Sequence, residues 1–154
     1  MRKLLTTLVV GLAVTAMGAF AADNSLGTWK LNMEKSKFTP SAPVKSLTST
    51  REASDGGVKV TTTGERADGT PINASYTAKY DGKEYPVTGA PYDTIAIKKA
   101  NANTYTARLK NKGDKYSTTA RSVISKDGKT MTTTNNGTDG KGDPISFTMV
   151  YEKQ

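Results

Sequence analysis

The segment Ile72-Asn73-Ala74-Ser75-Tyr76-Thr77-Ala78-Lys79-Tyr80, followed directly by Asp81-Gly82, decides the fold class of this chain. Its apolar and aromatic side chains alternate with polar ones. A period of two is typical of a β-strand with one buried face. The Asp-Gly pair suits a tight hairpin turn, because both residues tolerate a positive φ. The segment therefore predicts an antiparallel strand that turns straight into its neighbour.

The same pattern recurs along the rest of the chain. Further Asp-Gly pairs stand at 55–56, 68–69, 127–128 and 139–140, separated by short runs rich in Thr, Val, Ile and Tyr. A meander of this length twists until its edges meet. We therefore predict an all-β fold, an antiparallel up-and-down meander of about 8–10 strands that closes into a β-barrel, with a β-sandwich as the alternative. The expected strands are Leu26–Asn32, Lys45–Glu52, Lys59–Glu65, Ile72–Tyr80, Glu84–Val87, Thr94–Lys98, Thr104–Lys110, Tyr116–Ser125, Thr130–Asn135 and Ile145–Glu152.

The beginning of the sequence predicts export. Arg2 and Lys3 precede an uncharged apolar run, which ends in Ala19-Phe20-Ala21. A charged start, a short apolar middle and an A-x-A end are typical of a cleavable signal peptide. A membrane anchor is the alternative, but Thr and Gly residues interrupt the run. We expect residues 1–21 to be a signal peptide, residues 22–154 to form a single barrel domain, and the product to be periplasmic or secreted, with no transmembrane span after cleavage.

The composition excludes several classes of chemistry. The chain has no Cys and no His, so it can form neither a Ser–His or Cys–His pair nor the usual zinc site. Nearly every Asp stands beside Gly, where turn formation explains it. We predict that the protein is not an enzyme and uses no cofactor or metal.

Positive charge is concentrated in one segment of the chain. The formal net charge is +8, and the segment 98–129 contains most of the excess. Such a segment is typical of a solvated face whose lysines protect strand edges, or of a surface for an anionic partner. Its basic residues are Lys98, Lys99, Arg108, Lys110, Lys112, Lys115, Arg121, Lys126 and Lys129.

The two ends of the expected domain carry a resemblance. The first strand contains Gly27-Thr28-Trp29-Lys30-Leu31 and the last ends Val150-Tyr151-Glu152-Lys153. This pair resembles the calycin superfamily, the lipocalins and fatty-acid-binding proteins. The stretch Gly27–Asn32 with Lys35-Ser36-Lys37-Phe38, followed later by Ser125–Thr132, also resembles a group of exported bacterial proteins without an assigned activity. The resemblance implies a calycin-like barrel in which Trp29 plugs the closed end and the interior holds a lipid or another small apolar molecule.

Two departures limit what carries over from the fatty-acid-binding branch. The segment Met33–Val44 is too short and too rich in proline for the family's helical lid. The carboxylate clamp, Arg-x-Tyr on the last strand, would fall on Met149-Val150-Tyr151, where Met replaces Arg. A neutral or aromatic ligand is therefore expected.

The resulting functional prediction is an exported lipocalin-like carrier or sensor that binds a small apolar or aromatic molecule inside the barrel. The alternative is a non-enzymatic macromolecule-binding module, an envelope scaffold or an inhibitor of an exported enzyme, which uses the basic face 98–129. The expected partner is a small hydrophobic ligand or, under the alternative, an anionic surface or acidic protein; nucleic acid is not expected. The residues expected to line the binding site are Tyr76, Tyr80, Tyr105, Phe147, Met149 and Tyr151.

Overall fold

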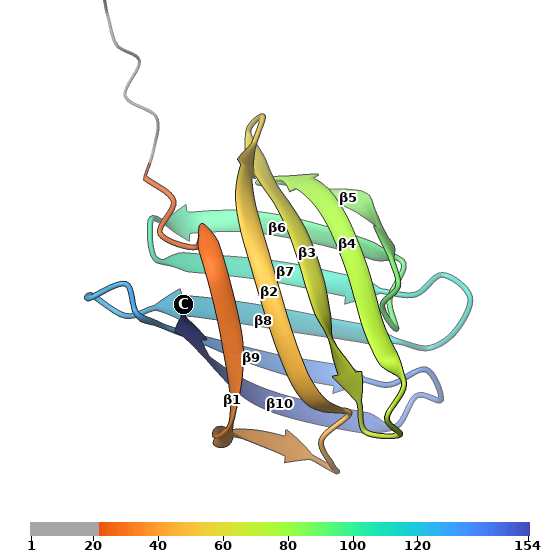
Figure 1. The fold of residues 1–154 in the computed structure, drawn as a ribbon. Coiled ribbons are helices and arrows are strands. Elements are labelled where there is room, and N and C mark those ends of the chain that lie inside the picture. Colours follow the sequence, from red (N-terminus) through yellow and green to blue (C-terminus); the bar gives the residue numbers. More distant parts are fainter. Residues whose placement is uncertain (1–21) are drawn as a thin grey trace, which may run out of the picture.

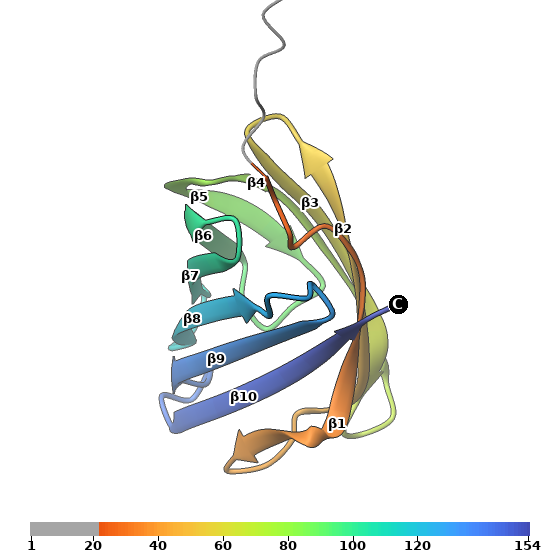
Figure 2. The same ribbon diagram turned by 90° about the vertical axis from the view of Figure 1, so that its left-hand side faces the viewer.

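The structure is a computed structural model that describes residues 22–154. The expected signal peptide, residues 1–21, lies outside the described residues. Ten antiparallel strands follow one another around a closed barrel, and β1 pairs with both β2 and β10 (Figures 1 and 2). The predicted all-β, up-and-down barrel is confirmed, and the β-sandwich alternative is wrong. The strands are β1 Gly27–Thr39, β2 Val44–Ser54, β3 Gly57–Arg66, β4 Pro71–Lys79, β5 Asp81–Thr88, β6 Thr94–Asn101, β7 Thr104–Lys110, β8 Ser117–Ile124, β9 Thr130–Thr138 and β10 Pro144–Lys153.

Turn chemistry explains why neighbouring strands are joined so tightly. Between β8 and β9, the Asp127 carboxylate accepts hydrogen bonds from the Ser125 hydroxyl at 2.6 Å and from the Lys129 amide at 3.0 Å. Gly128 follows with a φ of 72°, a conformation that a residue with a Cβ adopts only at a cost. Asp and Gly therefore do separate work in the turn, since one satisfies local donors and the other supplies the left-handed backbone.

The first strand differs most from its prediction, because it continues to Thr39 instead of ending at Asn32. A register shift between Asn32 and Lys37 bends β1, after which it pairs with β10 again. The Ser36 hydroxyl stabilises the bend by donating to the Asn32 carbonyl at 2.6 Å and accepting from the Val150 amide at 3.0 Å. The bend also brings the ring of Phe38 to 5.5 Å from that of Phe147, which β10 contributes.

Trp29 fills the end of the barrel at which β1 begins. Its side chain is fully buried and packs with Leu31, Tyr105 and Met131. The indole Nε1 donates to the Ser25 carbonyl at 2.8 Å, so the polar edge of the ring is satisfied. Residues 22–26, which precede β1, lie across this end, where the Asn24 amide donates to the Ala102 carbonyl in the loop between β6 and β7.

Candidate functional site

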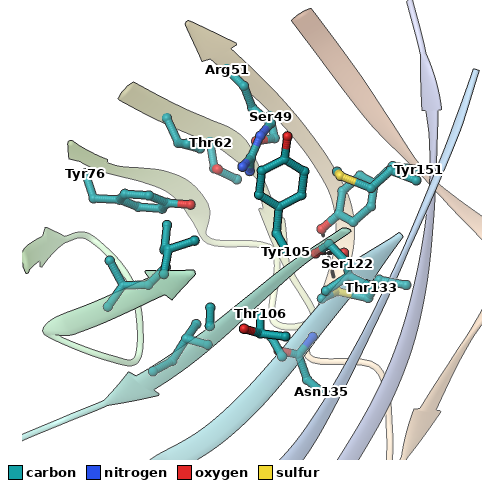
Figure 3. A pocket seen from close by; sticks show the side chains of 18 of the residues that line it. Ser49, Arg51, Thr62, Tyr76, Tyr105, Thr106, Ser122, Thr133, Asn135 and Tyr151 are labelled. Carbon is teal, nitrogen blue, oxygen red and sulfur yellow. Dashed lines mark hydrogen bonds between the residues drawn. The ribbon is translucent and has the colours of Figure 1, made fainter. Parts of the chain in front are cut away.

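A cavity of about 150 Å³ lies inside the barrel (Figure 3). It exists because many inward positions carry small or hydroxylated side chains, such as Ala107 and Ala120, which oppose each other on β7 and β8. The residues that line it come from most of the strands and from the loop between β5 and β6. They are Ser49, Arg51, Val60, Thr62, Tyr76, Tyr92, Ile95, Ile97, Tyr105, Thr106, Ala107, Leu109, Ala120, Ser122, Met131, Thr133, Asn135, Met149 and Tyr151.

Arg51 is the one charged residue among those that line the cavity. Strand β2 places it on the inner side of the wall, opposite Val60 of β3, and Figure 3 shows its side chain directed into the cavity. Its Nε is shielded from solvent and has no hydrogen-bond partner. Burial lowers the pKa of the guanidinium, but the combined effect of Tyr76, Tyr80 and the Asp23 carboxylate outweighs burial and leaves the pKa above its usual value. Arg51 is therefore a permanent cation inside the barrel.

Four tyrosines give the cavity its aromatic character: Tyr76, Tyr92, Tyr105 and Tyr151. Burial raises the pKa of Tyr151 to about 12, and it raises the pKa of Tyr92 still further. Both phenols are thus neutral near pH 7 and can donate or accept a hydrogen bond. The Tyr151 hydroxyl contacts the Met149 sulfur at 3.6 Å, which is a weak acceptor that a better one could replace.

Tyr105 also belongs to a second polar cluster, which lies around Asp23 at the end of the barrel that Trp29 fills. Asp23 accepts hydrogen bonds from the hydroxyls of Tyr105 and Tyr80 and from both the hydroxyl and the amide of Ser25. Burial raises the pKa of the Asp23 carboxyl, but the bonds from Ser25, Tyr105 and Tyr80 outweigh it and hold the pKa below its ordinary value. Tyr105 therefore has its ring against the cavity and its hydroxyl tied to the residues that close the barrel.

The structure brings four of the six residues expected at the site to the cavity: Tyr76, Tyr105, Met149 and Tyr151. Tyr80 lies in the cluster around Asp23, where its ring is 5.4 Å from that of Tyr105. Phe147 packs on Phe38. Neither of these two is among the residues that line the cavity.

Sequence reasoning overlooked Arg51 and Tyr92. The signal for Arg51 was present, because an inward Leu47 places Ser49 and Arg51 on the same face of β2. A charged residue in a strand is usually exposed to solvent, so Arg51 was not expected to face the interior. Tyr92 lies outside any strand, so no alternation could have indicated it.

The nine basic residues of the segment 98–129 do not form one continuous ridge. Lys98, Arg108 and Arg121 gather around a hollow on the outer face of β6, β7 and β8. The others lie on the surrounding strands and loops. Lys99 reaches the plugged end, where it donates to the Ala22 carbonyl. Lys110, Lys112 and Lys115 lie at one end of β8, and Lys126 and Lys129 at its other end, about 25 Å away.

No protein-family model matches this chain, and no curated protein matches it significantly. Its ten-strand, closed antiparallel barrel is compatible with a calycin-like architecture. Residues 22–154 contain no group of three or more acidic side chains placed to hold a metal ion. In that same part of the chain, no helix is long and apolar enough to cross a membrane.

Proposed function

We propose that this protein is an exported, lipocalin-like carrier or sensor that binds a small aromatic molecule inside its barrel. The observation that carries the proposal is a cavity lined by four tyrosines together with buried polar groups that lack partners. Such groups are costly when nothing satisfies them, which is typical of a surface shaped for a ligand. The signal-peptide pattern of residues 1–21 supports export, and the Gly27-Thr28-Trp29 motif supports a calycin-like relationship.

Two features fit a ligand better than a filled core. The Nε of Arg51 and the Nδ2 of Asn135 are buried without partners and belong to residues that line the same cavity. Native cores rarely leave such atoms unsatisfied. The volume of about 150 Å³ is close to that of engineered apolar cavities that accept one benzene ring. The proposed ligand is therefore of single-ring size.

The proposal is tested by extracting the purified protein with organic solvent and identifying the released compounds by mass spectrometry. A thermal-shift panel of single-ring aromatic compounds tests binding directly. Ala120→Leu fills part of the cavity and is expected to abolish both signals, whereas Thr119→Leu changes the neighbouring, exposed position of β8 and should preserve them. A protein that releases no compound and is stabilised by no aromatic probe would contradict the proposal.

A second candidate function uses the outer face. Lys98, Arg108 and Arg121 are exposed, lie around one hollow and form no ion pair within the described residues. Such a cluster can attract an anionic surface or an acidic protein. Replacing all three with Glu is expected to abolish salt-sensitive retention on anionic vesicles. The same change at Lys126 and Lys129, on the distant turn, serves as the control and should reduce retention much less.

A further inference from the structure

No carboxylate contacts the Arg51 guanidinium within residues 22–154, and Asp23 favours its charge only from beyond ion-pair distance. The structure gives this guanidinium no ion pair with any carboxylate, and no acidic residue lines the cavity. Removing a charge from water is expensive, so buried charges in proteins are ordinarily paired and hydrogen-bonded. Arg51 is partly buried and faces the cavity with an Nε that has no partner, so an anion in the cavity would complete its contacts.

The nearest candidate within the protein is already committed elsewhere. The Asp23 carboxylate accepts four hydrogen bonds, two from Ser25 and one each from Tyr80 and Tyr105. Burial raises the pKa values of Tyr92, Tyr105 and Tyr151 above the ordinary value of a phenol, so these three side chains are neutral near pH 7 and supply no counter-charge. An anion in direct contact with Arg51 must therefore come from outside the described residues.

The groups beside Arg51 suit an oxyanion. Ser49 lies two residues before it on β2, and the register pairs Ser49 with Thr62 on β3, so two neighbouring hydroxyl side chains lie on the wall that carries Arg51 (Figure 3). A planar guanidinium can donate two parallel hydrogen bonds to a carboxylate, and the hydroxyls can donate to the same oxygens. Beyond this polar patch, the rings of Tyr76 and Tyr151 and the side chain of Ile95 line the cavity.

We propose that the ligand is a single-ring aromatic anion, such as an aromatic carboxylate, whose charged group pairs with Arg51 while its ring occupies the tyrosine-lined part of the cavity. This inference rests on the proposed binding function and specifies its ligand class. An anionic ligand differs from the neutral one expected from the sequence, where Met149 of β10 stands at the position of the clamp arginine. Strand β2 provides a cation in its place, Arg51. A cavity of about 150 Å³ also excludes a fully enclosed long-chain fatty acid, since it holds little more than one ring.

The test compares benzoate with benzyl alcohol, a neutral probe of nearly the same size, by isothermal titration calorimetry on the purified protein. Benzoate is expected to bind about 10- to 100-fold more tightly, as charge-assisted hydrogen bonds would give. Arg51→Met should remove this preference and leave the affinity for benzyl alcohol nearly unchanged. Arg51→Lys keeps the charge without the bidentate geometry and should preserve only part of the preference.

Arg121→Met is the matched control, because it removes an exposed arginine from the outer face. It should leave the preference for benzoate intact, and circular dichroism verifies that each variant is folded. Equal binding of the two probes to the wild-type protein, or an unchanged preference in Arg51→Met, overturns the anion inference while the binding function stands. Binding of neither probe overturns the binding function, and the anion inference with it.

Discussion

Replacing Arg51 with Met is expected to stabilise the unliganded protein. The substitution removes a partly buried cation that forms no ion pair, together with a shielded Nε that has no hydrogen-bond partner. Most single substitutions inside a barrel destabilise it, so an increase in stability is a discriminating outcome. The chain of Met follows much of the path of the arginine stem, and the change in apolar burial is therefore small.

The size of the effect follows from two contributions. An unsatisfied buried donor costs about 1–3 kcal/mol, and replacing buried charges with apolar side chains of similar volume has stabilised proteins by up to about 4 kcal/mol. Part of this cost is already offset in the native protein, because Arg51 is partly exposed and Tyr76 and Asp23 favour its charged form. We therefore expect the free energy of unfolding to rise by about 1–3 kcal/mol, and Tm by roughly 4 °C for each kcal/mol in a domain of this size.

The assay is urea unfolding followed by the fluorescence of Trp29. It is the single tryptophan of the chain and is fully buried, so its emission reports loss of the native barrel. The control Arg121→Met should change the free energy of unfolding by less than about 0.5 kcal/mol. Saturating benzoate should reduce or reverse the difference in free energy of unfolding between wild type and Arg51→Met, because a ligand stabilises the protein that binds it. An Arg51→Met protein less stable than wild type by more than about 1 kcal/mol would refute the reasoning.

Three further substitutions test the closed end and the wall. Asp23→Asn should lower the free energy of unfolding by about 1–2 kcal/mol near pH 7, as measured by urea unfolding. Because the fold lowers the pKa of Asp23, the difference between the two proteins should shrink once the pH falls below 3.8, the ordinary pKa of this carboxyl. A difference that grew in acid would contradict this prediction. Trp29→Phe removes the hydrogen bond to the Ser25 carbonyl and should lower the free energy of unfolding by about 2 kcal/mol, seen as a lower Tm by circular dichroism. An unchanged Tm would contradict a stabilising role for this hydrogen bond. Gly64→Ala would place a Cβ 2.1 Å from the Ser46 carbonyl oxygen, so a loss of about 2–3 kcal/mol is expected, and a neutral result would mean that β2 and β3 can separate at this point without cost.

Local pattern was sufficient for the strands and their order. Alternation over 72–80 placed Tyr76 and Ala78 on the buried face, and the Asp-Gly pairs marked the turns, because both signals depend only on neighbouring residues. The boundaries of β1 could not be obtained in this way. Its continuation to Thr39 depends on pairing with Phe147 and Thr148, more than a hundred residues later in the chain.

The sequence by itself determined that this chain forms a meander of antiparallel strands, each with one apolar and one polar face. It also determined that the chain has no histidine and no cysteine for catalysis or metal binding. Only the tertiary structure decided that the interior keeps a cavity and that Arg51 faces it. The physical reason is that a strand's period specifies which residues share a face, whereas the space left inside depends on all ten strands together. Closure of the barrel placed Arg51, a partly buried residue of β2, at the wall of the cavity.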